Sequence, residues 1–282
     1  MNNLSKTFRY VNENGESLTF TFDEGLLINK PVGIDTVQVS LTQAQGINQV
    51  GATVQSTNVQ PRAVTVNGRL VGEFQQEMKN RLLSVVRPDL KARFYADDYY
   101  LDVQPTATPT ITPEPQFANF QFSVLAPYPY WQHDESVSAE LTGIEYGFKF
   151  PVNLSRSYKF GELIITQFVN VPNFGQLPVP FTVTFNALNA VVNPRIVNAK
   201  TNAVLQIRKA LQAGEKVTVQ ITHGKTYVTS SIDGDIRGAL SLSSNLYRLD
   251  VGDNVLKPEA DSGFENLTVS IDFATEIVGV AL

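Results

Sequence analysis

The chain has 282 residues, enough for two domains of ordinary size, and its 43% of apolar residues argue against extensive disorder. A net charge of -5 argues against binding to nucleic-acid phosphates, which requires clustered Lys and Arg. The absence of cysteine excludes disulfides, thiolate metal sites and cysteine nucleophiles.

Charged residues make up 17% of the chain, below the roughly 25% typical of soluble domains. The surface is therefore rich in amide and hydroxyl side chains, which suits a subunit whose faces are covered by neighbours. We see no signal peptide at the start of the sequence. No stretch approaches the ~18 uninterrupted apolar residues of a membrane span. We expect synthesis in a cytoplasm and no membrane insertion.

The chain opens with alternating, strand-like segments. Residues 7–11 and 17–22 flank an Asn-Gly turn and predict a hairpin. Residues 34–41 alternate again, with apolar side chains at every second position. Residues 46–58 are polar, flexible and poorly patterned, and a loop of this length in a compact domain is usually functional or disordered.

Residues 59–71 predict a long strand, with a bulge at Gly68. Arg62 and Arg69 flank this strand. They either pair with carboxylates of a neighbouring subunit or remain solvated charges at a sheet edge, and the sequence leaves both readings open.

One helix follows the long strand. Phe74, Met78, Leu82 and Val85 recur at helical spacing, and Pro88 ends the pattern. The apolar face of this helix predicts core packing rather than a cofactor site. Turn residues then separate strands at 91–95 and 99–103, before a segment rich in Pro and Thr at 104–116 that predicts an extended edge or a loop.

Residues 117–126 are the clearest strand, with apolar side chains alternating with Asn, Gln and Ser. Prolines then prevent a central strand from continuing, so the strand ends in an aromatic segment that contains Tyr128, Tyr130 and Trp131. We interpret this segment as a domain junction, which divides the chain into residues 1–135 and 136–282. The alternative is a strand followed by a loop within one domain.

The second half contains many short, turn-bounded strand candidates and no convincing helix. This pattern indicates an antiparallel sandwich or jelly roll. The segment at 203–211 fits a helix by its spacing, but we predict a strand there. The strand candidates are residues 148–152, 163–169, 181–185, 195–197, 203–211, 217–221 and 267–273.

The sequence shows no catalytic motif. His133 and His223 lie far apart and lack metal-binding spacing, so we predict neither a metal nor a cofactor. The carboxylate pairs Asp97-Asp98 and Asp233/Asp235 lie at turns, where Asp caps backbone groups. We interpret these carboxylates as structural unless they converge across a cleft, as the two carboxylates of a glycosidase must.

Four features, in their order along the chain, resemble the distal tail proteins of siphophages that infect Gram-positive hosts. These are the flexible stretch leading into VQPRAVTVNGRLVG, the single helix ending at Arg87-Pro88, the strand FANFQFSVLAPYPYW, and the run VNPRIVNAKTNAVLQIRKALQAGEKVTVQI with SLSSNLYRLDVGDNVL downstream.

This resemblance implies a mainly β protein. Its amino-terminal domain would be a ring-forming β-sandwich with one helix, and its carboxyl-terminal domain a galectin-like, jelly-roll sandwich. Family members form hexameric rings that join the tail tube to the tip protein and, in many phages, to the receptor-binding apparatus, and DNA passes through without specific binding. A projecting arm embraces the next subunit, and we place it at residues 46–58. The expected interface residues are therefore Gly46, Val50, Gly51, Val54, Arg62 and Arg69.

The resemblance also implies a virion protein without catalysis. The region from about Glu140 contains no Trp, so sugar binding there would depend on tyrosines such as Tyr227 or Tyr247. We therefore predict an adaptor rather than a lectin. A carbohydrate-binding module for host-surface adhesion and a hydrolase of cell-wall polymers remain as alternatives.

Overall fold

The computed structural model describes residues 6–72, 75–146, 161–164 and 168–280. The chain divides into two compact units. The first comprises Met1–Asp134 and Glu276–Leu282, and the second comprises Glu135–Thr275. The observed division thus returns the end of the chain to the first unit, whereas the sequence assigned all of residues 136–282 to the second domain.

The first unit is built on one antiparallel sheet with the strand order β2-β1-β7-β8-β10-β6-β3. Strand β9 pairs with β10, and β11 pairs with both β8 and β25. The strands are β1 (Phe8–Asn12), β2 (Ser17–Thr19), β3 (Leu26–Ile28), β6 (Arg62–Leu70), β7 (Ala92–Ala96), β8 (Tyr99–Pro105), β9 (Thr110–Pro113), β10 (Ala118–Ala126), β11 (Trp131–His133) and β25 (Glu276–Ile277). The extended segment predicted at 104–116 contributes the edge strand β9.

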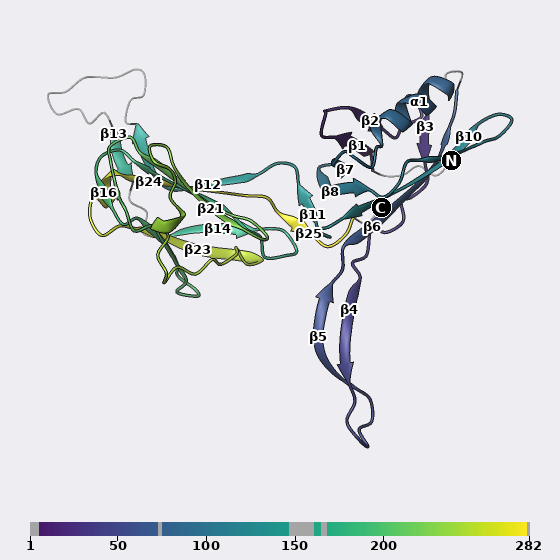
Figure 1. The fold of residues 1–282 in the computed structure, drawn as a ribbon. Coiled ribbons are helices and arrows are strands. Elements are labelled where there is room, and N and C mark those ends of the chain that lie inside the picture. The colour runs from purple at the N-terminus through teal and green to yellow at the C-terminus, as the bar shows by residue number, and fades with distance from the viewer. Residues whose placement is uncertain (1–5, 73–74, 147–160, 165–167, 281–282) are drawn as a thin grey trace. The chain divides into compact units, whose positions relative to one another are not determined.

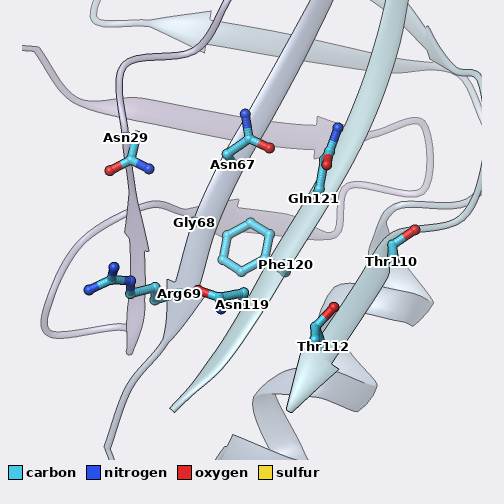
Figure 2. Close-up of a pocket in the computed structure, with 9 residues that line it drawn as sticks. All are labelled: Asn29, Asn67, Gly68, Arg69, Thr110, Thr112, Asn119, Phe120 and Gln121. Atoms are coloured by element: carbon cyan, nitrogen blue, oxygen red, sulfur yellow. The ribbon is translucent and has the colours of Figure 1, made fainter. Parts of the chain in front are cut away.

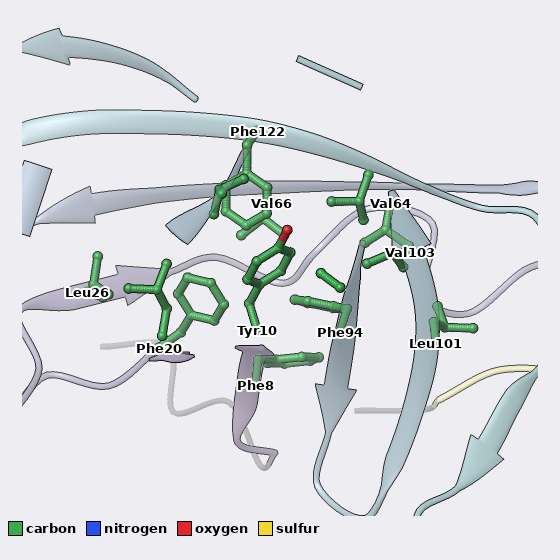
Figure 3. Packing of buried hydrophobic residues seen from close by; sticks show 14 of the residues in the cluster. Phe8, Tyr10, Phe20, Leu26, Val64, Val66, Phe94, Leu101, Val103 and Phe122 are labelled. Atoms are coloured by element: carbon green, nitrogen blue, oxygen red, sulfur yellow. The ribbon is translucent and has the colours of Figure 1, made fainter. Parts of the chain in front are cut away.

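The two halves of this sheet enclose one hydrophobic core (Figure 3). Strands β6 and β10 bury every second residue, as alternation predicts. The rings of Tyr10 and Phe122 meet edge-on at 6.0 Å, and those of Phe8 and Phe94 stack at 5.7 Å. The sandwich predicted for the amino-terminal half is therefore confirmed.

Helix α1 (Gln75–Val85) covers part of this core and buries Leu82 and Val85. Met78 is partly buried against the same cluster, whereas Phe74 lies outside the described residues. In the part of the chain that the structure describes, no helix is long and apolar enough to cross a membrane.

Two further strands, β4 (Val39–Ala44) and β5 (Thr53–Val59), pair with each other and form a separate two-stranded ribbon. We call residues 39–59 the arm; Figure 1 shows it extending away from the body of the first unit. The expectation of a poorly patterned loop at 46–58 was wrong for residues 53–58, which form a strand because residues 39–44 supply their backbone partners.

The second unit is also antiparallel. Its sheets have the orders β13-β12-β24-β15-β20-β21-β22, β14-β23-β17-β18 and β16-β19, and its core is a second hydrophobic cluster. The strands are β12 (Val137–Tyr146), β13 (Gly161–Ile164), β14 (Val169–Asn173), β15 (Thr182–Ala187), β16 (Val191–Val192), β17 (Arg195–Asn198), β18 (Val204–Gln206), β19 (Ala210–Leu211), β20 (Lys216–Ile221), β21 (Thr226–Ser230), β22 (Gly234–Asp235), β23 (Gly252–Glu259) and β24 (Leu267–Phe273).

The second unit also has two short 3-10 helices, Arg237–Ala239 and Phe264–Asn266. The ambiguous segment at 203–211 is extended, as predicted, and forms β18 and β19. The strand candidate at 148–152 lies outside the described residues, as do residues 165–167 of the candidate at 163–169. The mainly β fold predicted from the sequence is confirmed.

Candidate assembly interface

Every residue of β4 and β5 is exposed, and no charged residue occurs between Asp35 and Arg62. Solvated ribbons normally carry charged side chains, which keep them soluble and prevent edge pairing. A lone two-stranded ribbon is also marginally stable in water. The arm therefore has the composition of a segment that is covered by a partner.

The pairing register gives the arm two different faces. Val39 lies opposite Val59 and Leu41 opposite Thr57, so these side chains share a face. A bulge then leaves Gln55 unpaired and brings Val54 opposite Gln43. This bulge keeps Val54 on the apolar face, which single-residue alternation along β5 would not do. The opposite face carries Ser, Thr and Asn side chains together with Ala44.

The tip of the arm is also apolar. Ile47 and Val50 are fully exposed, at 98% and 101%, and Gly46 and Gly51 bracket them. Gly51 has a φ of +82°, a conformation that favours glycine. We call Val39, Leu41, Val54 and Val59 the apolar stripe of the arm. The sequence analysis named Val50 and Val54 as interface residues but missed Ile47 and the rest of this stripe. The long stretch without charge was the signal that could have found them.

Arg62 lies at the base of the arm. It is neither a solvated charge at a sheet edge nor exposed for pairing with a neighbour's carboxylate, the two roles considered from the sequence. Its side chain is buried, and its guanidinium donates to the carbonyl oxygens of Pro129 at 2.6 Å, Ile34 at 2.6 Å and Gly33 at 3.1 Å. It also donates to the carbonyl of Val278. Burial lowers the pKa of Arg62. Arg62 therefore braces the base of its own arm.

The carbonyl oxygen of Ile34 collects two more donors, the indole N–H of Trp131 at 3.1 Å and the backbone N–H of Val280 at 3.2 Å. Trp131 is fully buried in the first unit's core. The base of the arm is thus joined to the segments that leave for, and return from, the second unit.

The other two aromatic residues predicted at the junction lie beside Trp131 in the chain. The Tyr128 hydroxyl donates to Glu276 Oε2 at 2.6 Å. The rings of Tyr128 and Tyr130 pack edge-on, with 5.4 Å between their centroids. Both tyrosines are half-buried, so within the first unit they contribute packing around strands β11 and β25.

Arg69 lies at the other end of β6, is exposed, and stacks on the ring of Phe117 at 4.8 Å. It borders a hollow of about 280 Å³ on the outer face of the sheet (Figure 2). The hollow is lined mainly by amide and hydroxyl side chains. The lining residues are Asn29, Asn67, Gly68, Arg69, Thr110, Thr112, Asn119, Phe120 and Gln121.

The candidate carboxylate pairs lie at turns. Asp97 has a φ of +52° and accepts a hydrogen bond from the backbone N–H of Thr7 at 2.8 Å. Asp235 accepts one from the backbone N–H of Arg237 at 3.1 Å. No cluster of three or more His, Asp or Glu suited to a metal occurs among the residues that the structure describes.

The two tyrosines considered for sugar binding have different surroundings. Tyr227 is 42% exposed on β21. Tyr247 packs against the core, with its ring 5.2 Å from that of Phe181, and burial raises its pKa. Tyr247 is therefore partly buried against the core, and Tyr227 is the more exposed of the two rings.

The fold and the arm together define a structural subunit made of β-sandwiches, and the comparisons with known proteins relate it to phage tail components. Residues 174–276 match the family model of the siphovirus-type tail component, C-terminal domain. No curated protein sequence matches the chain.

Among solved structures, the chain is similar to SPP1 Dit (gp 19.1), described as a paradigm of the hub adsorption apparatus in Gram-positive-infecting phages. The TM-score is 0.70 at 11% identity, covering 95% of this chain and 98% of that one. It is also similar to a chain of the phage P2 baseplate in its activated conformation with Ca, with a TM-score of 0.51 at 9% identity, covering 98% and 100%. At these identities the likeness concerns the fold.

Residues 174–276 thus match the siphovirus-type tail component family, and nearly the whole chain has the fold of SPP1 Dit. Both findings support the distal tail protein (Dit) family predicted from the sequence.

Proposed function

We propose that copies of this chain assemble through the arm into a hexameric ring. The ring is a hub that joins the tail tube to the tail tip or baseplate and, through it, to the receptor-binding apparatus. The observation that carries this proposal is the arm itself, whose residues are all exposed although none is charged.

We place the surface that receives the arm on the body of the subunit, so each subunit contacts one neighbour with its arm and a second neighbour with its body. Such a heterologous contact repeats around an axis and closes into a ring when the rotation permits. Burial of the Val39, Leu41, Val54 and Val59 stripe supplies apolar stabilisation at about 25 cal/mol per Å² removed from water.

The hub acts by assembly and carries no catalytic role. Its lumen gives DNA a path without a specific binding site. A net charge of -5 suits this role, because a wall dense in Lys and Arg would hold phosphate and slow DNA passage.

Shortening the arm tests the proposal. The backbone N–H of Gln60 already donates to the carbonyl of Gln38 at 2.9 Å, so a two-residue Asn-Gly turn can replace residues 39–59 without opening the base. We expect the full chain to sediment as a closed oligomer and the shortened chain as a monomer. An oligomer of unchanged size after this replacement would overturn the proposal.

A matched pair of substitutions separates the arm from general surface effects. Val50 on the arm and Leu242 in the second unit are both fully exposed, at 101% and 100%. We expect Val50→Ser to weaken assembly and Leu242→Ser to leave it unchanged. Equal effects of the two substitutions would contradict a specific role for the arm.

A further inference from the structure

The outer face of the β3–β6–β10–β9 sheet is almost free of charge. Along β6 and β10, the residues that alternate with the core are Ala, Thr, Asn, Ser, Gln and Leu, and Arg69 is the single charged one. On the β3 side, Leu27 lies opposite Arg69 and Val32 opposite Thr65, with exposures of 37% and 64%. Solvated protein surfaces normally mix in about 25–35% charged residues, so this face is unusual.

The outer face of the other half of the same sheet shows the contrast. There Arg9 stacks on Tyr95 and Arg93 on Tyr100, each at 4.3 Å, and Arg93 pairs with Asp102 at 3.2 Å. The nearby hollow on β1 and β7 also carries Glu13 and Lys91. Charged side chains on that face pair with each other or are solvated, as on an ordinary exposed surface.

The amide side chains on the outer face of β3, β6, β10 and β9 have no comparable side-chain partners among the described residues. Among the described residues, no side-chain hydrogen bond involves Asn29, Asn67, Asn119 or Gln121, although all four line one hollow (Figure 2). Each amide offers two N–H donors and a carbonyl acceptor. Together they can pair with backbone N–H and C=O groups along the edge of an extended chain, in either direction.

We infer that this face receives the arm of a second copy of the chain. The inference rests on the proposed function and adds the surface on which the arm lies. An uncharged ribbon placed on a charged face would remove water from the charged groups without offering them a charged partner. This desolvation would cost free energy. Placed over Asn67, it meets amides that can bond its backbone and leaves the aliphatic side chains of Leu27 and Val32 to contact its apolar stripe.

Arg69 fits the same contact. Its guanidinium carbon lies over the ring of Phe117, 4.8 Å from the ring centroid. A guanidinium stacked on a ring can still donate through its N–H groups. Arg62 shows in this molecule how an arginine can hold extended backbone by donating to carbonyl oxygens alone. Arg69 can hold a neighbour's arm in that way without an acidic partner.

A chain cannot place its own arm there. The arm joins β6 at Arg62, whereas the hollow surrounds Asn67 to Arg69 at the opposite end of that strand. Figure 1 shows the arm extending away from the sheet. The arm over the hollow therefore comes from a neighbour.

An isosteric charge tests the surface. Gln121 and Gln220 are both exposed residues inside strands, and neither side chain makes a hydrogen bond to a described residue. We expect Gln121→Glu to raise the protein concentration needed for half-assembly by about tenfold, because the arm would bury the new carboxylate without a charged partner. Gln220→Glu in the second unit should leave that concentration unchanged. An unchanged value for Gln121→Glu would overturn the inference.

Disulfide trapping provides the second measurement, since the chain has no native cysteine. Single-cysteine variants on the apolar face of the arm (Gln43→Cys or Thr57→Cys) are mixed with Gln121→Cys and oxidised, and a Gln220→Cys chain serves as the control partner. We expect cross-linked dimers with Gln121→Cys only. If arm replacement abolishes assembly while Gln121 neither cross-links nor responds to charge, this inference fails and the proposed function stands. If arm replacement has no effect, the proposed function itself fails.

Discussion

The guanidinium of Arg62 donates a hydrogen bond of 2.6 Å to the carbonyl oxygen of Ile34, and this bond joins the two segments that flank the arm. The same guanidinium binds Pro129 and Val278, which belong to the segments that lead to and from the second unit. One buried side chain thus fixes the point from which the arm projects.

Replacing Arg62 with Met removes donors from four buried or partly buried carbonyl groups. We expect the free energy of unfolding of the first unit to fall by about 3 kcal/mol. Fluorescence of Trp131, the single tryptophan, reports this transition during denaturant unfolding. Arg69→Met, on an exposed arginine of the same strand, should change the free energy by less than about 0.5 kcal/mol. Equal effects would contradict the bracing role.

Replacing Trp131 with Ala should lower the stability of the first unit by about 3–5 kcal/mol, because its fully buried ring fills the core. Circular dichroism would follow this variant, which has lost its fluorescent probe. Trp131→Phe keeps most of the ring volume but loses the N–H that donates to Ile34, so it should be less destabilising. Wild-type stability of the alanine variant would contradict the observed packing.

A methyl group at Gly279 would lie 2.1 Å from the carbonyl oxygen of Asp35. We therefore expect Gly279→Ala to displace the returning segment from the base of the arm and to destabilise the first unit by about 1–3 kcal/mol. Gly224→Ala is the control, since nothing lies within 4 Å of a Cβ at Gly224. Thermal melting of both variants makes the comparison, and equal melting temperatures would argue against this close contact.

Glu215 makes the stability of the second unit depend on pH. Burial alone would raise its pKa, but hydrogen bonds from Lys209, Ser230 and the backbone of Gln212 hold it below the ordinary value. Because the folded pKa is the lower one, the stabilisation is present above the unfolded pKa and is lost as the pH falls through the folded pKa.

Thermal melting between pH 7 and pH 3 would measure this dependence. We expect the melting temperature of the second unit to fall more steeply with acidification in the wild type than in Glu215→Gln, whose side chain does not ionise. Parallel curves for the two proteins would contradict a stabilising role of the ionised carboxylate.

Regular alternation explains which parts of the fold the sequence predicted. Phe120, Phe122 and Val124 alternate with polar residues, and they lie in β10 as expected. The arm was predicted only by resemblance, because its unpaired Gln55 interrupts the alternation and neither strand packs on the body. The burial of Arg62 could not be predicted from spacing, since its acceptors come from three distant parts of the chain. Strand β25 is two residues long and carries no pattern.

The mass of the full chain in solution, measured by native mass spectrometry, tests most directly whether the uncharged arm exists to bind another copy. We predict a closed species of six chains of 31.1 kDa each, which separates into single chains when the arm is replaced by a turn. A full-length protein that remains a single chain at every soluble concentration, with its arm in water, would contradict it.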